Sequence, residues 1–80
     1  MKVVIKDSKI NGKPIIKAWE SFTGWYWFAV EEIEQGYFYG FVIGSYPEWG
    51  YFTEKELKAN FPFIWEIKQS DMPLIDKEVA

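Results

Sequence analysis

Two strand-forming segments, residues 25–32 and 37–43, constrain the fold most, because both are apolar on both faces. They are rich in aromatic and β-branched residues, which favour strands. Between them, residues 34–36 end in a glycine and are typical of a three-residue hairpin loop. A strand with two apolar faces has to be covered on both sides or to use one face for contact. We therefore expect this hairpin to be central in an antiparallel sheet.

The three-residue loop also predicts the register of this hairpin. It places Trp27 opposite Ile43, so that Trp25, Trp27, Tyr37 and Tyr39 share one face of the sheet. The spacing of Gly40 and Gly44 within a strand indicates close backbone packing or an aromatic ring lying over a glycine.

The N-terminal segment predicts a second hairpin, in which residues 2–7 pair with residues 15–20. Asn11-Gly12 is a strong signal for a type I′ turn. A two-residue loop would place Lys6 opposite Lys17, which is unfavourable, so we expect a bulge or a longer loop. Pro14 favours a place at the edge of the sheet for the return strand.

The remaining segments predict one helix and one further strand. Residues 44–50 are rich in Gly and Pro and predict a loop. Thr53 and Glu56 form a capping-box pattern that begins a helix of about residues 53–60, and Pro62 ends it. Residues 63–68 predict the last strand, and the tail from Ser70 is expected to be irregular and partly mobile. The expected fold is α+β: a single domain, residues 1–80, with an antiparallel sheet of four to five strands and one short helix packed on one face.

Composition narrows the chemistry that the chain can perform. It has no Cys, no His and no Arg, which excludes thiolate and imidazole metal ligands and His-dependent acid–base catalysis. The remaining catalytic options are a desolvated Lys or a carboxylate pair, as in glycosidases, for which Glu31, Glu32 and Glu34 are the candidates. At a strand end, however, a solvated turn explains these acids better. We predict that the chain is not an enzyme and binds neither a cofactor nor a metal. It has no apolar run of membrane-spanning length, and we expect a cytoplasmic protein.

Aromatic residues are in surplus, with five Trp, five Tyr and seven Phe in 80 residues. Most must form the core, yet the core of so small a domain does not cover them all. Aromatic side chains are favoured anchors at interfaces. We expect the surplus to form a contact surface or a homodimer interface, with Trp25, Trp27, Tyr37, Tyr39 and Trp49 as the candidate binding residues.

Charge is unevenly distributed. Residues 1–17 contain five Lys and one acid, whereas the rest of the chain contains four Lys and eleven acids. Lys13 and Lys17 would share a strand face, where they are candidate phosphate contacts of a single-stranded nucleic-acid site. The alternative is that the lysines protect a sheet edge from aggregation, and the absence of Arg favours this alternative.

The middle of the chain carries a motif that spans residues 23–57. It consists of Thr23-Gly24-Trp25, Trp27, Ala29 and Glu31, then Phe38, Gly40, Val42, Ile43 and Gly44, then Pro47-Glu48, Gly50-Tyr51-Phe52 and Glu56-Leu57. This pattern resembles an uncharacterised family of small proteins found on plasmids, phages and other mobile elements. The resemblance implies a mobile-element setting and the hairpin–helix arrangement, but no activity.

These observations favour a non-enzymatic binding module over an enzyme. The primary hypothesis is a protein–protein interaction module encoded by a mobile element, which inhibits a host factor or associates with itself. The alternative is single-stranded nucleic-acid binding by aromatic stacking and the N-terminal lysines.

Overall fold

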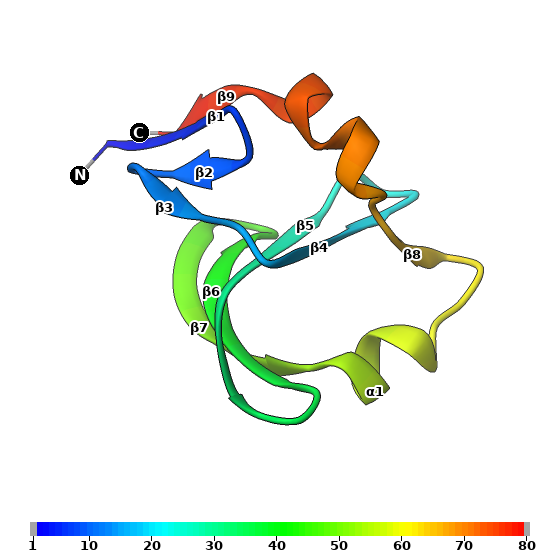
Figure 1. Ribbon diagram of the computed structural model, residues 1–80. Coiled ribbons are helices and arrows are strands. Elements are labelled where there is room, and N and C mark those ends of the chain that lie inside the picture. The colour runs from blue at the N-terminus through cyan, green and yellow to red at the C-terminus, as the bar shows by residue number, and fades with distance from the viewer. Residues whose placement is uncertain (1, 80) are drawn as a thin grey trace.

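A computed structural model describes residues 2–79 of the chain, which form two antiparallel sheets, one short α-helix and one 3₁₀ helix (Figure 1). The five-stranded sheet has the order β7-β6-β5-β4-β8, with β4 Lys17–Ser21, β5 Tyr26–Glu34, β6 Tyr37–Ile43, β7 Pro47–Thr53 and β8 Ile64–Glu66. The four-stranded sheet has the order β3-β2-β1-β9, with β1 Val3–Lys6, β2 Lys9–Ile10, β3 Lys13–Pro14 and β9 Lys77–Val79. The helices are α1 (Glu54–Lys58) and the 3₁₀ helix η1 (Gln69–Ile75). The prediction of antiparallel strands with one short α-helix is confirmed, but the domain is mostly β and contains a second sheet.

The second sheet covers one face of the five-stranded sheet. Phe28 and Phe41 from the larger sheet are buried in one cluster with Val3, Ile5 and Ile10 from the smaller one. This second layer explains how a hairpin with two apolar faces is covered on that side.

The opposite face of the five-stranded sheet packs against α1. Trp19 is buried there, with its ring centroid 5.5 Å from that of Phe38 and 5.9 Å from that of Phe52. The predicted capping box is confirmed: the Glu56 backbone N–H donates to Thr53 Oγ1 (3.2 Å), and the Thr53 N–H donates to Glu56 Oε1 (3.0 Å). The helix is shorter than expected and places Leu57 in this second cluster.

The predicted N-terminal hairpin is wrong in its pairing. Asn11 and Gly12 do have positive φ angles, 48° and 83°, as a type I′ turn requires. However, this turn joins β2 to β3, and a second tight turn at residues 7–8 joins β1 to β2. Lys6 therefore lies opposite Lys9, and residues 17–21 pair with β5 and β8 instead. Long-range pairing outweighs the local hairpin signal here.

The predicted register of the central hairpin is confirmed only where Glu31 lies opposite Tyr39, and is wrong on both sides of that stretch. Irregularities after Ala29 and after Glu32 shift the pairing, so that Trp27 lies opposite Val42 and Ala29 opposite Gly40. A β-bulge adds one residue to one strand and reverses the relation between the faces of the two strands.

Gly40 and Gly44 have the roles expected from their spacing, although β6 ends at Ile43 and only Gly40 lies within the strand. A Cβ atom on Gly40 would lie 1.9 Å from the Phe28 carbonyl oxygen, so the backbones approach closely at the bulge. A Cβ atom on Gly44 would lie 2.7 Å from the indole of Trp25, which covers that glycine.

Two further segments differ from expectation. Most of the predicted loop of residues 44–50 belongs to β7, an edge strand that tolerates Pro47 as its first residue. The tail beyond Ser70 forms most of η1 and then β9, which pairs with β1 and brings the two ends of the described chain together (Figure 1). Neither helix within residues 2–79 has the length and apolar character needed to cross a bilayer.

Candidate functional site

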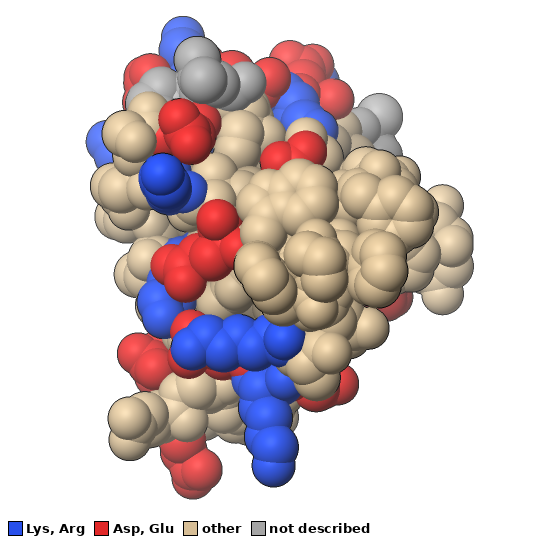
Figure 2. Space-filling model, turned by 90° about the vertical axis from the view of Figure 1, so that its right-hand side faces the viewer, with Lys and Arg blue, Asp and Glu red and all other residues tan. Residues whose placement is uncertain are grey.

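Four aromatic side chains are exposed around β8, at one edge of the five-stranded sheet. Phe22 is 69% exposed, Phe61 72%, Phe63 59% and Trp65 36%. We call these four residues the β8 aromatic edge. From the β8 side, uncharged side chains form a continuous area bordered by charged ones (Figure 2). Large exposed apolar patches on small domains mark interaction sites.

The connection from α1 to β8 explains why these rings lie at the surface. The Asn60 carbonyl accepts hydrogen bonds from the N–H groups of Phe63 (2.7 Å) and Ile64 (3.2 Å), which closes a tight turn after the helix. The Phe22 N–H donates to the Phe63 carbonyl (3.0 Å), and the two rings are 5.5 Å apart. The turn and the strand ladder thus hold the rings beside β8, outside both core clusters.

The outer side of β8 is a free strand edge. The Ile67 N–H donates to the Ala18 carbonyl (2.8 Å), in the same ladder as the Phe22–Phe63 bond. Because antiparallel backbone bonds alternate, the backbones of Ile64 and Glu66 point away from β4. Within residues 2–79, the Ile64 carbonyl and both backbone groups of Glu66 have no backbone partner beyond this ladder. Such an edge is a template for another strand.

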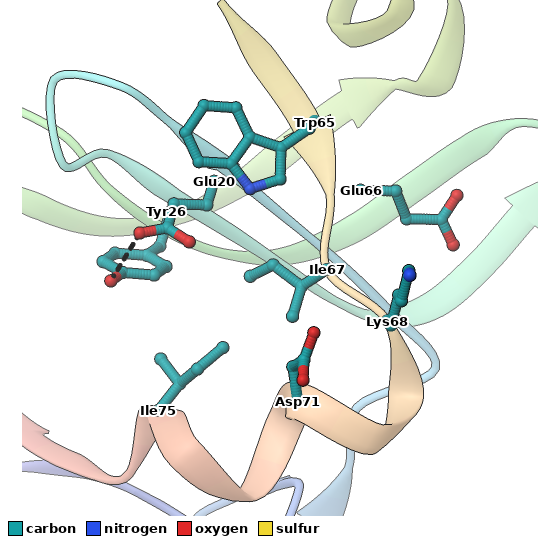
Figure 3. A pocket seen from close by; sticks show the side chains of 8 residues that line it. All are labelled: Glu20, Tyr26, Trp65, Glu66, Ile67, Lys68, Asp71 and Ile75. Carbon is teal, nitrogen blue, oxygen red and sulfur yellow. Dashed lines mark hydrogen bonds between the residues drawn. The ribbon is translucent and has the colours of Figure 1, made fainter.

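Two hollows lie on opposite sides of β8. The first, which we call the acidic hollow, has a volume of about 380 Å³ (Figure 3). Its lining residues are Glu20, Tyr26, Trp65, Glu66, Ile67, Lys68, Asp71 and Ile75. The second, the apolar hollow, has a volume of about 390 Å³. Its lining residues are Trp19, Leu57, Lys58, Phe61, Ile64, Trp65 and Glu66.

The acidic hollow has an ordered wall. The Tyr26 hydroxyl donates to Glu20 Oε2 at 3.0 Å, as Figure 3 shows. Burial, and then the bond to Glu20, raise the pKa of Tyr26 above its ordinary value of 10.0, so the phenol stays protonated as a donor. Lys77 Nζ lies 3.8 Å from the Tyr26 ring centroid, and burial lowers its pKa while the charge of Glu20 opposes this shift. Glu20 is thereby held with its carboxylate beside the hollow.

The structure separates the five predicted binding residues into two groups. Trp25 and Trp27 lie on the α1 side of the sheet with ring centroids 6.0 Å apart, and Trp25 lines a smaller hollow of about 160 Å³. Tyr39 and Trp49 pack on the face toward the small sheet, and Tyr37 stacks with them through Tyr51. The single surface expected from the unbulged register therefore does not form.

The two lysines proposed as phosphate contacts are also separated. Lys13 lies on β3 in the four-stranded sheet, whereas Lys17 lies on β4 in the five-stranded sheet. Lys17 Nζ donates to Glu54 Oε2 at 2.7 Å. This hydrogen bond raises the pKa of Lys17 and lowers that of Glu54. Lys17 thus ties α1 to β4.

Of the three acids near the central turn, one stabilises the turn and two face solvent. Glu32 Oε2 accepts the Gly36 N–H at 2.9 Å, and Glu31 and Glu34 are exposed. Among residues 2–79, no three acidic side chains are placed to share a metal ion.

Sequence reasoning missed the β8 aromatic edge as a site. The available signal was the Phe61-Pro62-Phe63 run, because a proline that ends a helix leaves its neighbours outside regular structure. Comparison of the chain with protein-family models, with curated proteins and with solved structures finds no match.

Proposed function

We propose that this chain is a non-enzymatic module that binds another protein through the β8 aromatic edge. The observation that supports this most directly is the exposure of four aromatic rings beside a free strand edge. Burying an aromatic ring stabilises a fold by about 1.5–3 kcal/mol, and a domain of this size has little stability to spare. Rings that stay largely in water contribute little of this stabilisation to the fold, whereas a partner that covers them gains it, and aromatic residues are enriched in protein interfaces.

In this proposal the module is encoded by a plasmid or phage and inhibits a host factor in the cytoplasm. The mobile-element setting rests on the resemblance of residues 23–57 to small proteins of such elements. A small inhibitor needs a contact surface and no catalytic group, which agrees with the predicted lack of activity.

Single-stranded nucleic acid is the less favoured partner. Exposed rings can stack on bases, but Glu20, Glu66 and Asp71 line the hollow beside Trp65 and repel phosphates there. We expect Trp fluorescence to change little on titration with mixed-sequence single-stranded DNA at about 50 and 200 mM salt. Quenching that weakens steeply with salt would favour the nucleic-acid alternative. Light scattering on the same sample tests for a homodimer.

The main test selects binders from a displayed library of bacterial protein fragments. Binders of the wild-type chain are then measured by calorimetry against Phe61→Ser/Phe63→Ser and against the control Tyr46→Ser/Tyr51→Ser. The control changes two rings that are equally exposed, at 66% and 62%, but lie away from β8. We expect the edge variant to weaken binding by about tenfold or more and the control to leave it unchanged. The reverse pattern would refute the proposed surface, and circular dichroism confirms that both variants fold.

A further inference from the structure

A strand that paired with the free edge of β8 would also contact both hollows. Trp65 pairs with Glu20 and shares its side of the sheet, toward the acidic hollow. Ile64 and Trp19 line the apolar hollow from the other side. Successive side chains of a strand point to opposite faces of a sheet. A strand added to β8 would therefore direct one side chain into the acidic hollow and the next into the apolar hollow.

The acidic hollow has the chemistry to receive a cationic side chain. Glu66 and Lys68 lie toward one side, and the Asp71 carboxylate and the Trp65 indole lie across the opening from each other (Figure 3). Glu20 and Asp71 bring carboxylates to this hollow and Lys68 an ammonium group, whereas Glu66, at its border, pairs with Trp19 and belongs to the other face of the sheet. Within residues 2–79, the salt bridges use other acids, Glu54 and Glu78. A Lys or Arg side chain gains charge-assisted hydrogen bonds from carboxylates and a cation–π contact from an indole.

The apolar hollow complements this on the other side. Trp19 and Leu57 form its buried floor, and Phe61 and Ile64 lie beside them. These residues offer carbon surface to a large aliphatic or aromatic side chain. Burial of such a side chain supplies affinity, while the backbone bonds supply register.

The charge of the acidic hollow argues against a second copy of this chain as the occupant. Antiparallel pairing of two β8 strands about a two-fold axis would put both acidic hollows on one face of the joined sheet. The carboxylates of the two hollows would then lie on the same face, and the second copy would bring no cation into the opening of the first beyond the Lys68 that already lines it, which is unfavourable. A segment of another protein that carries its own cation fits the hollow better.

The other sheet edge, β7, does not offer the same combination. The hollow beside Trp25 reaches β7 through Glu48, and the hollow beside Tyr37 reaches it through Thr53. These positions lie at the two ends of the strand, whereas both hollows at β8 include Trp65 and Glu66 from its middle and end.

We propose that the partner contributes an extended peptide segment that pairs with β8 as a sixth strand of the sheet. One Lys or Arg of this segment enters the acidic hollow. A large apolar residue, an odd number of positions away, enters the apolar hollow. This inference rests on the proposed function, because it names the kind of partner segment that the β8 aromatic edge binds.

The test uses displayed random dodecapeptides, selected on the immobilised full chain. We expect the enriched peptides to combine a basic residue with a large apolar residue at an odd spacing. Synthetic versions with the basic residue changed to Glu, or with N-methyl groups on the backbone positions that face β8, should bind about tenfold more weakly. Enrichment without this spacing, no enrichment at all, or indifference to N-methylation would overturn the inference.

Reversing a charge of the protein tests whether the basic residue of the peptide binds in the acidic hollow. Asp71→Lys should weaken the selected basic peptide about tenfold and strengthen its Glu version. Glu31→Lys makes the same charge change at the exposed end of the central hairpin and should affect both peptides equally. Equal effects of the two variants would overturn the assignment of the cation to the acidic hollow.

These outcomes separate the inference from the proposed function. Protein fragments whose binding is lost in Phe61→Ser/Phe63→Ser, but which lack the basic–apolar spacing, would leave the proposed function intact and remove the added strand. Binders whose affinity does not depend on the β8 aromatic edge would contradict both the proposed function and the added strand.

Discussion

The two edges of the five-stranded sheet are both rich in aromatic residues, but their rings have different neighbours. On β7, the Trp49 ring lies 5.9 Å from that of Tyr39 and 5.1 Å from that of Phe41. Tyr51 lies 4.9 Å from Tyr39 and stacks on Tyr37 at 5.7 Å. These rings form a ladder with those of the adjacent strand β6.

On β8 the rings border open space instead. Phe63 packs against Phe22, which is itself exposed, and Phe61 and Trp65 line the hollows. Cross-strand aromatic pairs each contribute about 0.5–1.5 kcal/mol beyond area burial. The same residue types therefore stabilise the fold at β7 and remain available to a partner at β8.

The largest expected effect concerns the close backbone contact between β6 and β5, which positions β6 as the neighbour of β7. Gly40→Ala places a methyl group against the Phe28 carbonyl oxygen, and we expect a loss of about 3 kcal/mol in the free energy of unfolding. Gly50→Ala is the control, because its methyl group meets no atom within 4 Å. Urea unfolding of both variants checks this, and equal losses would contradict the role assigned to Gly40.

A direct comparison of the edges replaces one tryptophan on each. Trp49→Ala removes a ring packed on Tyr39 and Phe41, and should lower the free energy of unfolding by about 2 kcal/mol. Trp65→Ala should cost less than about 1 kcal/mol but abolish binding of the selected peptides. Thermal unfolding and calorimetry measure the two effects, and a larger stability loss for Trp65 would reverse the assignment.

A smaller contrast concerns the most exposed rings of the two edges. Tyr51→Ser removes the contacts with Tyr37 and Tyr39 and should cost about 1 kcal/mol. Phe61→Ser, at a side chain that is 72% exposed, should change stability by no more than about 0.5 kcal/mol. Urea titrations resolve this difference, and a clear loss for Phe61→Ser would mean that this ring belongs to the core.

The smallest effect concerns the ion pair that ties α1 to β4, on the β8 side of the sheet. Glu54 has a lowered pKa in the fold, so its contribution to stability is present above pH 4.5 and is lost as the pH falls through the lowered pKa. Lys17 has a raised pKa, so its contribution to stability is present below pH 10.5 and is lost as the pH rises through the raised pKa. Because Lys17 is 38% exposed, we expect only about 0.5 kcal/mol.

The contribution of this ion pair is measured as the difference in the free energy of unfolding between about pH 7 and about pH 3. Lys17→Met should reduce the loss of stability on acidification, and Lys55→Met, on the exposed side of α1, should not. An unchanged pH dependence in Lys17→Met would show that the pair contributes nothing measurable.

Several local features could be predicted from sequence because they depend on neighbouring residues. The capping box at Thr53, the type I′ turn at Asn11 and the positive φ of Gly36 each follow from interactions within a few positions. The strand after the helix was also expected, at residues 63–68, and forms β8 over Ile64–Glu66, whereas β9 was not expected.

The candidate site could not be predicted in the same way. The face that Trp27 shares with its neighbours depends on bulges after Ala29 and Glu32, and composition does not reveal where an extra residue enters a strand. The exposure of Phe61 and Phe63 depends on which elements pack over them. That is a property of long-range pairing.

The sequence by itself determined the strand-rich character, the central hairpin, the turns and the start of the helix, because short-range sterics and hydrogen bonds set these features. Only the tertiary structure decided that β9 would pair with β1, that a second sheet would cover Phe28 and Phe41, and that β8 would lie at an edge between two hollows. Burial depends on which distant segments come together. Rings of the same kind therefore became core at one place and exposed surface at another.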